Sequence, residues 1–331
     1  MIEPVMEKGH PSRKGFFTKA KLDSFMRGTH LMLIAFHSFG WSGGKYHSSW
    51  SPMIPGRTNH SRGPADLWSS IASNLLRQRS GTLLREMPTP TREKIAKPLD
   101  DRSEEEWLAR SISFSLRSMD ISVEQIAEFY HEQLVNLLAD GPVDGRRFAR
   151  TQDQTLFAHV HSFFLHFGAA RDYLAALIAA RIGKDPGKID SMARLIEVLR
   201  SKDIGTDVLL KLLKTRKFIQ PTPNNANRRA ISGWLKEASD LRNQFVYRRP
   251  YGARHVERFG HAAAISPEMG LYRYVRPVLV ENDAEQDILD IVVFHYKQAI
   301  ALFQDAAGMS GRDISILTLT DEDIISASKA G

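Results

Sequence analysis

The chain has 331 residues, of which 42% are hydrophobic and 25% are charged, a composition typical of a globular protein with one or two domains. It contains no cysteine, which excludes a disulfide framework and thiolate catalysis and favours a cytoplasmic location. The formal net charge of +7 favours polyanionic partners such as RNA, DNA or an anionic membrane surface.

The apolar segments of the chain are predicted to be too short to cross a membrane. A transmembrane helix needs roughly 18 to 20 apolar residues, and the best candidate, Leu31–Phe36, is far shorter. Glu3 and Glu7 lie upstream of this segment and His37 interrupts it, which argues against a signal peptide. We therefore interpret Leu31–Phe36 as a short buried helix or strand, and we expect no membrane partner.

Residues 1–100 are predicted to form an irregular N-terminal extension. The stretch 40–64 is rich in Gly, Ser, His, Pro and Trp, which predicts a loop or linker. A short helix is predicted at 66–76, where apolar residues recur at every fourth position. The prolines between 87 and 98 then break any further helix.

Residues 101–310 have strongly helical patterns and are predicted to form one domain. Ser103 is followed by acidic residues, and Ser122 makes a capping box with Gln125, so helices are predicted to begin at both serines. The cleanest pattern is an apolar seam with spacings of three and four, which suits packing in an antiparallel bundle. Its members are Leu156, Val160, Phe163, Phe167, Ala170, Leu174 and Leu177.

The rest of this domain is predicted to hold two more long helices around a small β element. One helix runs from about Ala226 to Tyr247, and the strand-favouring residues 271–280 predict a hairpin arm or edge strand. A last long helix precedes a C-terminal tail at 311–331. The predicted fold class is mainly α, an antiparallel helical bundle with a small β-hairpin or edge-strand embellishment. The inward residues of the last helix are predicted to be Ile288, Ile291, Val292, His295, Ala299 and Leu302.

The end of the helix predicted at 226–247 concentrates positive charge and polar donors. Arg242 is followed by further arginines and then by Pro250, which cannot continue a helix. A helix end with this many donors is a natural anion site. The alternative interpretation of Arg242 is structural, with its guanidinium satisfying helix-end carbonyls or pairing with Asp240 or Glu237.

This pattern resembles the signature of the HEPN superfamily, whose members are small helical bundles that include many RNA-cleaving toxins and defence proteins. In that family an arginine, usually followed by a polar residue, is separated from a histidine by a short spacer. Arg242 and Asn243 match the first two positions, and Tyr247 stands where the histidine would be. The resemblance covers residues 105–308 and implies a metal-free site shared by two copies of the chain.

The resemblance implies a catalytic role for each of these three residues. In HEPN ribonucleases the histidine helps to activate the ribose 2′-hydroxyl, and the arginine stabilises the charged phosphorus transition state. Arg242 would bind phosphate, Asn243 would orient groups by hydrogen bonding, and Tyr247 would replace the base. A tyrosine with an ordinary pKa is on the order of 0.1% phenolate at pH 7, so we expect impaired ribonuclease chemistry. His255 or His261 is the alternative base.

Basic and aromatic residues follow the motif and predict contact with nucleic acid. Arginines bind phosphates, while aromatic and imidazole rings stack on bases. A charge run of this kind is alternatively a solvated protein face. The predicted nucleic-acid-binding residues are Arg248, Arg249, Tyr251, Arg254, His255 and Arg258.

Three functions are consistent with these patterns. The first is a HEPN-like protein that binds RNA or a nucleotide and has impaired ribonuclease chemistry. The second is an active, metal-independent endoribonuclease of a toxin or defence system, and the third is a non-catalytic structural or interaction module. We expect a homodimer, with no cofactor and no metal. An antitoxin-like nucleotidyltransferase is the alternative partner, although Arg249 occupies the position at which such paired family members have a tyrosine.

Overall fold

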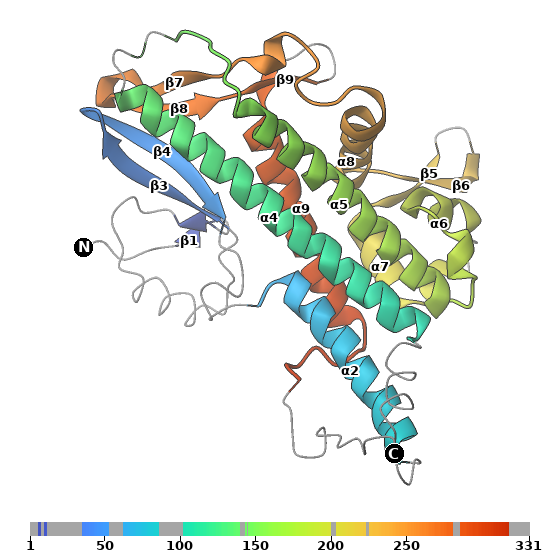
Figure 1. The fold of residues 1–331 in the computed structure, drawn as a ribbon. Helices are drawn as coiled ribbons and strands as arrows, with labels where there is room; N and C mark the ends of the chain where they lie inside the picture. Colours follow the sequence, from blue (N-terminus) through green and yellow to red (C-terminus); the bar gives the residue numbers. More distant parts are fainter. Residues whose placement is uncertain are drawn as a thin grey trace, which may run out of the picture. The chain divides into compact units, whose positions relative to one another are not determined.

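The computed structural model describes residues 6–7, 10–11, 35–52, 62–85, 102–139, 143, 145–199, 203–222, 225–280 and 285–317. Within these residues the protein is mainly α-helical, as predicted (Figure 1). The α-helices are α2 (Pro64–Arg85), α4 (Glu104–Ala139), α5 (Asp153–Arg181), α6 (Met192–Val198), α7 (Val208–Thr215), α8 (Trp234–Arg242) and α9 (Ile288–Met309). The strands are β1 (Met6–Glu7), β2 (His10–Pro11), β3 (Ala35–Ser42), β4 (Lys45–Pro52), β5 (Ile219–Thr222), β6 (Asn225–Ile231), β7 (His261–Ser266), β8 (Leu271–Val275), β9 (Pro277–Leu279) and β10 (Glu285–Asp287).

The chain forms two compact units, each assembled from three separate segments. Residues 1–100 therefore contribute to both units through β3, β4 and α2. The helix predicted at 66–76 is present, and α2 extends it to 22 residues. Unit 1 comprises Met1–Gly63, Arg117–Phe167 and Ala238–Ile300, and unit 2 comprises Pro64–Leu116, Gly168–Glu237 and Ala301–Gly331.

Unit 1 contains a four-stranded sheet with the strand order β3-β4-β8-β7. β3 and β4 form an antiparallel hairpin beside α4 (Figure 1), and β4 pairs in parallel with β8. The hairpin turn is formed by Gly43 and Gly44, whose φ angles of 54° and 73° both lie in the left-handed region. Gly43 has a second reason to lack a side chain, because a Cβ there would lie 1.9 Å from the Leu138 carbonyl oxygen.

The prediction of a loop at 40–64 is therefore wrong over residues 40–42, which end strand β3, and over Lys45–Pro52, which is strand β4. The composition of this stretch is typical of a loop, but pairing with β3 and β8 overrides that local preference. The sequence did carry a signal for this hairpin, because two adjacent glycines are a favoured two-residue turn. The residues predicted to be strand-favouring at 271–280 form β8 and β9.

Two predicted helix starts differ from the structure. Ser122 lies inside α4 and not at a cap, because its hydroxyl donates to Ser118 O at 2.9 Å and contacts Ser162 Oγ on α5 at 3.0 Å. The helix predicted from Ala226 begins only at Trp234, since the preceding residues pair with β5 as strand β6. Both errors arise from tertiary contacts that local sequence patterns do not report.

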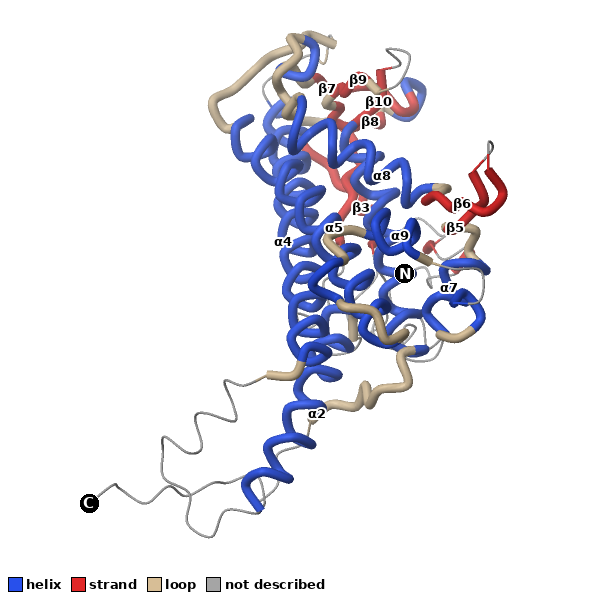
Figure 2. The backbone as a smooth tube through the Cα atoms, turned by 90° about the vertical axis from the view of Figure 1, so that its right-hand side faces the viewer, coloured by secondary structure: helices blue, strands red, loops and turns tan. Residues whose placement is uncertain are grey.

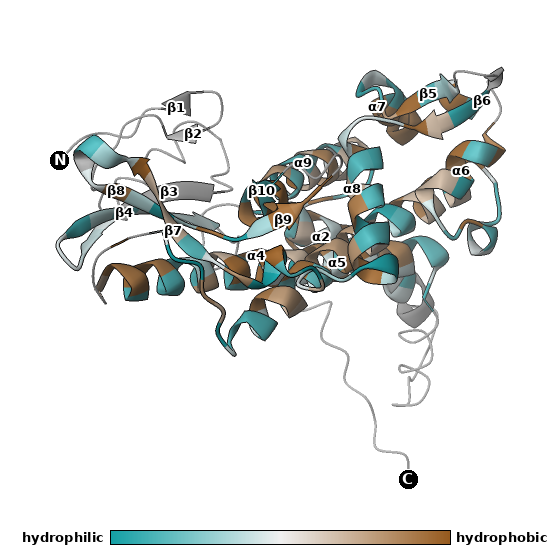
Figure 3. Ribbon diagram, turned by 90° about the horizontal axis from the view of Figure 1, so that it is seen from above, coloured by the Kyte–Doolittle hydropathy of each residue, from teal (hydrophilic) through white to brown (hydrophobic). Residues whose placement is uncertain are grey.

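The long helices supply the core, and α4 and α5 lie side by side in unit 1 (Figures 1 and 2). Every member of the predicted seam on α5 is at most 2% exposed, and all the predicted inward residues of α9 are buried, so both predictions are confirmed. Figure 3 shows the contrast between the largely hydrophobic α9 and the largely hydrophilic α8. Among the described residues, α5 alone is long and apolar enough by composition to cross a bilayer, and 67% of its most apolar window is buried inside the protein.

Unit 1 also buries charged and phenolic groups that hydrogen-bond to one another. Arg276 is fully buried, and its Nη1 and Nη2 atoms lie 3.0 and 2.9 Å from Asp153 Oδ2 at the start of α5. Tyr130 on α4 donates to Asp287 Oδ1 at 2.5 Å. Burial, reinforced by the Asp287 charge, raises the pKa of Tyr130 well above its usual range. The phenol therefore remains a donor at every physiological pH.

Unit 2 is organised around a buried tryptophan and a capping aspartate. Trp68 on α2 is fully buried, and its Nε1 donates to Phe303 O at 3.1 Å. Arg181 at the end of α5 donates to Asp207 Oδ2 at 2.8 Å, and Asp207 also caps α7 by accepting from Leu209 N at 2.8 Å. These contacts connect four helices within this unit.

We expect Arg276→Met to lower the free energy of unfolding by roughly 3–5 kcal/mol, because it leaves the Asp153 carboxylate buried without its cation. Urea denaturation followed by circular dichroism measures this change. The matched control is Arg194→Met, which breaks an exposed ion pair with Glu197 (2.7 Å) and should cost less than about 1 kcal/mol. Equal losses in the two variants would contradict a special role for the buried pair.

Candidate anion-binding turn at the end of α8

The residues of the HEPN-like pattern lie where α8 continues into a π-helical turn. α8 ends at Arg242, and Asn243–Arg248 have the wider π-helical geometry. Arg249 N donates to Gln244 O at 2.6 Å, which closes the turn, and Pro250 then ends the helix because it has no amide hydrogen. π-Helical turns occur frequently at functional sites, and here the turn changes which side chains meet.

Arg242 and Tyr247 meet on the outside of this turn. Arg242 Nη2 donates to Tyr247 Oη at 3.0 Å, and the guanidinium carbon lies 5.4 Å from the centroid of the phenol ring. Residues five apart in a regular α-helix point roughly 140° apart, so the wider turn brings these two side chains closer in direction. Tyr247 is 63% exposed and Arg242 is half-buried, so solvent reaches the pair.

Phe245 anchors the turn from the inside. It is fully buried, and its ring centroid lies 5.3 Å from that of Phe164 on α5 and 6.0 Å from that of Tyr251. Burial of an aromatic ring of this size contributes a few kcal/mol, which fixes the rotation of the turn. With Phe245 directed inward, the side chains of Asn243 and Arg248 are left exposed.

The loop that follows the turn is braced by its own side chains. Gly252 has a φ angle of 89°, and a Cβ there would lie 2.8 Å from the Phe157 ring, so both conformation and space require glycine. The buried Glu257 accepts hydrogen bonds from Gly252 N at 3.0 Å and Arg254 N at 3.3 Å. Arg258 Nε donates to Gly252 O at 3.1 Å. Arg254 and Arg258 therefore stabilise the loop, in addition to the nucleic-acid contact predicted for them.

Tyr251 does not have the role that the sequence predicted. Its side chain is only 4% exposed, and its hydroxyl donates to Pro277 O at 3.2 Å. Burial raises its pKa well above the usual range, despite the opposing charge of Arg276. A ring enclosed in this way cannot stack on a base, so the prediction that Tyr251 binds nucleic acid is corrected to a structural role.

The exposed members of the predicted set are Arg248, Arg249, His255 and Arg258. Arg248 and Arg249 directly follow Tyr247, so they extend the positive surface of the turn. The ring of His255 lies 4.8 Å from the ring of Phe259 (centroid to centroid), in the loop beyond. The structure thus retains two arginines beside the Arg242–Tyr247 pair as residues accessible to a polyanion.

An open pocket of about 760 Å³ lies between this loop and the start of α5. Arg150 and Arg258 supply positive charge to its wall, while Asp153 is occupied by Arg276. The α5 side of the pocket was not predicted as part of a site, because no local pattern brings residues 149–161 to the loop at 250–258. The lining residues are Ala149, Arg150, Asp153, Gln154, Phe157, Ala158, His161, Pro250, Tyr251, Gly252, Ala253 and Arg258.

The two alternative bases lie on different parts of unit 1. His255 is exposed in the loop after the turn, whereas His261 begins strand β7 and is half-buried. Burial, together with the nearby charge of Arg147, lowers the pKa of His261. His261 is therefore neutral at pH 7, which is the form that accepts a proton. In the described ranges, no group of three or more His, Asp or Glu side chains is arranged to hold a metal.

Comparison with known proteins gives no match for this chain. No family model matches it, and neither does any curated protein or solved structure. The class of protein is therefore defined by the fold alone, as a mainly α-helical protein with small sheets and an arginine-rich π-helical turn on the surface of unit 1.

We expect the same chemical change to have different effects at the two tyrosines of this region. Tyr251→Phe should lower the free energy of unfolding by about 1–3 kcal/mol, because it leaves the buried Pro277 carbonyl without its donor. Tyr247→Phe should change it by less than about 0.5 kcal/mol, because the lost hydrogen bond is exposed to water. Thermal unfolding of both variants checks this, and a large loss in Tyr247→Phe would assign the Arg242–Tyr247 pair to the stability of the fold.

Proposed function

We propose that this protein is a HEPN-like helical protein with impaired ribonuclease chemistry. It binds the phosphate groups of RNA or of a nucleotide at the turn formed by Arg242, Tyr247, Arg248 and Arg249. The observation that carries the proposal is the contact between Arg242 and Tyr247 on an accessible surface. These are the two positions that the HEPN signature pairs as phosphate ligand and base. A shared surface location is what a two-residue site requires.

The chemistry of the two side chains supports binding more than cleavage. A guanidinium offers a planar set of donors that matches phosphate oxygens, and the exposed phenol donates a hydrogen bond or stacks on a base. A phenol with no proton acceptor in the turn lacks the function of the family histidine at neutral pH. Asn243 is exposed beside the pair and is assigned an orienting role.

The proposal extends to assembly. We propose that the helices pack as an antiparallel bundle of the HEPN type and that two copies of the chain bring their Arg242 side chains toward one site, as the resemblance implies. The second candidate function is an active metal-independent endoribonuclease whose base would be His255 or His261. A non-catalytic interaction module, with or without an antitoxin-like partner, is the third.

Binding should depend steeply on salt. We expect the affinity for a single-stranded RNA oligonucleotide to fall with rising salt. The double variant Arg248→Ala, Arg249→Ala should flatten the slope of log affinity against log salt by about 1.4, or about 0.7 for each lost phosphate contact. Fluorescence anisotropy at several salt concentrations measures both values. The matched control is Arg194→Ala with Arg228→Ala, which removes the same charge from exposed positions of unit 2. Identical slopes in the two double variants would assign Arg248 and Arg249 to a solvated face.

Restoring a proton acceptor should restore cleavage. We expect the natural protein to cleave RNA weakly or not at all, and Tyr247→His to gain metal-independent cleavage that leaves 2′,3′-cyclic phosphate ends. Arg242→Ala in the same background should abolish the gain, and Tyr247→Phe should show none. The assay is run with a chelator present and is read on denaturing gels.

Two outcomes would contradict parts of this proposal. Robust cleavage by the natural protein would favour the active ribonuclease, and His255→Ala and His261→Ala would then identify its base. A Tyr247→His variant that binds RNA but never cleaves it would show that position 247 does not face the ribose. The turn would then be an anion-binding surface that lacks the geometry of a ribonuclease site.

A further inference from the structure

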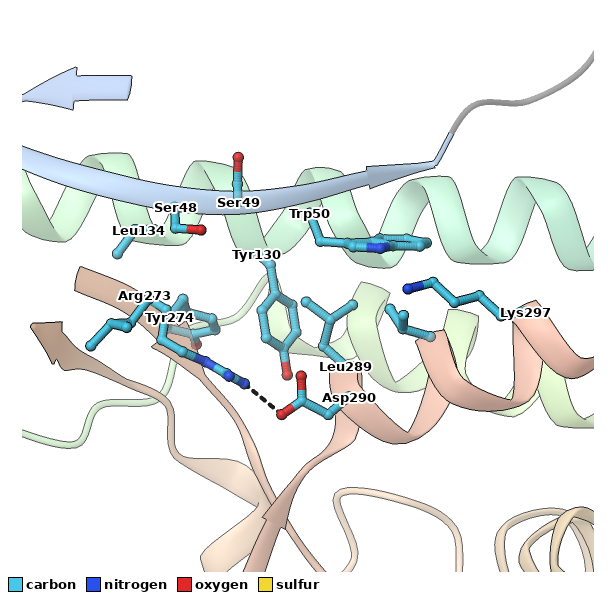
Figure 4. A pocket seen from close by; sticks show the side chains of 12 residues that line it. Ser48, Ser49, Trp50, Tyr130, Leu134, Arg273, Tyr274, Leu289, Asp290 and Lys297 are labelled. Atoms are coloured by element: carbon cyan, nitrogen blue, oxygen red, sulfur yellow. Dashed lines mark hydrogen bonds and ion pairs between the residues drawn. The ribbon is translucent and has the colours of Figure 1, made fainter. Parts of the chain in front are cut away.

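A second pocket, separate from the turn described above, lies within unit 1 and holds about 300 Å³ (Figure 4). Its wall is built by β4, β7, β8, α4 and α9. The volume is at the lower end of the roughly 300–1,000 Å³ of small-molecule sites. The lining residues are Ser48, Ser49, Trp50, Tyr130, Leu134, Ile265, Arg273, Tyr274, Leu289, Asp290, Val293 and Lys297.

Most of this wall is apolar. Leu134 and Leu289 are buried, Val293 is half-buried, and Ile265 is exposed. The rings of Tyr130 and Tyr274, whose centroids lie 5.1 Å apart, add aromatic surface. A ligand that fills this space therefore has an apolar body, because each buried methylene contributes about 0.8 kcal/mol.

Trp50 places an unsatisfied donor at one end of the pocket. The indole is only 5% exposed, and no acceptor in the described part of the chain hydrogen-bonds to its Nε1 atom. A buried N–H without a partner costs about 1–3 kcal/mol, so it is seldom retained without a ligand or solvent acceptor. Figure 4 shows the nitrogen-bearing edge of Trp50 directed into the pocket above Leu289.

Lys297 brings a positive charge to the same end. Figure 4 shows its amine extending from α9 toward Trp50 and Leu289. The side chain is half-buried, and desolvation lowers the pKa of its amine. An ammonium group in this position gains more from a counter-charge than one in water does, because the surrounding medium screens it less.

The opposite charges of Arg273 and Asp290 in the pocket wall are paired with each other. Arg273 donates to Asp290 Oδ2 at 2.8 Å and also to Asp287, and Asp287 accepts from Tyr130 at 2.5 Å. Burial raises the pKa of Asp287, although the hydrogen bond from Tyr130 and the charge of Arg273 oppose this. This network fixes Arg273 and Tyr130 as wall residues of the pocket.

From this juxtaposition we propose that the pocket binds a small organic monocarboxylate. One carboxylate oxygen accepts a hydrogen bond from Trp50 Nε1, and the other pairs with Lys297 Nζ. The apolar body of the ligand lies against Leu134, Leu289 and Val293. The inference is independent of the function proposed for the Arg242–Tyr247 turn. One neutral donor and one cation match the two oxygens of a carboxylate, whereas a phosphate group would need more donors. An amine ligand would place like charges together at Lys297.

The test uses octanoate, octan-1-ol and octylamine, which share one chain and differ in head group. Isothermal titration calorimetry of the natural protein should show saturable octanoate binding, with octan-1-ol and octylamine at least about tenfold weaker. The protein has five tryptophans, and the indole N–H resonance missing from Trp50→Phe identifies that of Trp50. Octanoate should shift this resonance, and octylamine should not.

Lys297→Met should weaken octanoate binding about tenfold or more, while the affinity for octan-1-ol changes by less than about twofold, because the substitution removes the charge and keeps an apolar chain. The matched control is Lys211→Met at an exposed position of α7, which should leave octanoate affinity unchanged. No saturable binding of octanoate, equal affinity for octylamine, or an unshifted Trp50 resonance in the natural protein would each overturn the proposal, whether or not Lys297→Met folds.

Discussion

The buried ion pair between Arg276 and Asp153 is the interaction on which the rest of unit 1 depends. Arg276 lies between β8 and β9, and its side chain reaches the first residue of α5, 123 positions earlier in the sequence. Its backbone takes part as well, because Ile288 N donates to Arg276 O at 3.0 Å where α9 begins. One residue thus connects the sheet with the starts of two helices. A buried pair of this kind stabilises little relative to an apolar pair, but it tolerates few alternative arrangements.

The polypeptide around Arg276 is correspondingly crowded. A Cβ at Gly260 would lie 1.9 Å from Tyr274 Oη and 2.8 Å from Arg276 Cδ, so this position requires glycine. Burial raises the pKa of Tyr274 to about 12, which keeps its hydroxyl protonated next to the guanidinium. Gly260 also exchanges backbone hydrogen bonds with Phe148, at 2.9 and 3.0 Å. The segment that precedes α5 and the segment that precedes β7 are therefore held to each other.

The two proposed binding sites of unit 1 differ in how far their binding groups are exposed to solvent. At the end of α8, Arg248 and Arg249 are solvated, so attraction to a polyanion is long-ranged and sensitive to salt. In the pocket beside Trp50, the indole donor is buried and the Lys297 amine is half-buried, so recognition depends on geometry and on reduced competition from water. An elongated polyanion suits the first condition, and a compact ligand with one charged group suits the second.

The sequence by itself determined the features that repeat within a few turns of the chain. The seam on α5 and the inward face of α9 follow from apolar spacings of three and four, and the accumulation of arginines after Arg242 is visible directly. Local pattern also located the strand-forming residues at 271–280, where a composition rich in tyrosine and valine favours β structure.

The tertiary structure alone decided how distant segments meet. β4 is a strand because β3 and β8 pair with it, and Tyr251 is buried against Phe157 and Phe245, where Pro277 O accepts its hydrogen bond. The π-helical turn that directs Arg242 toward Tyr247 is set by Phe245 packing against α5. Neither pocket has a signature in the sequence, since each combines residues from separate segments. The physical reason is that periodicity records which face of an element is apolar, while partners and enclosed space depend on packing between elements far apart in the chain.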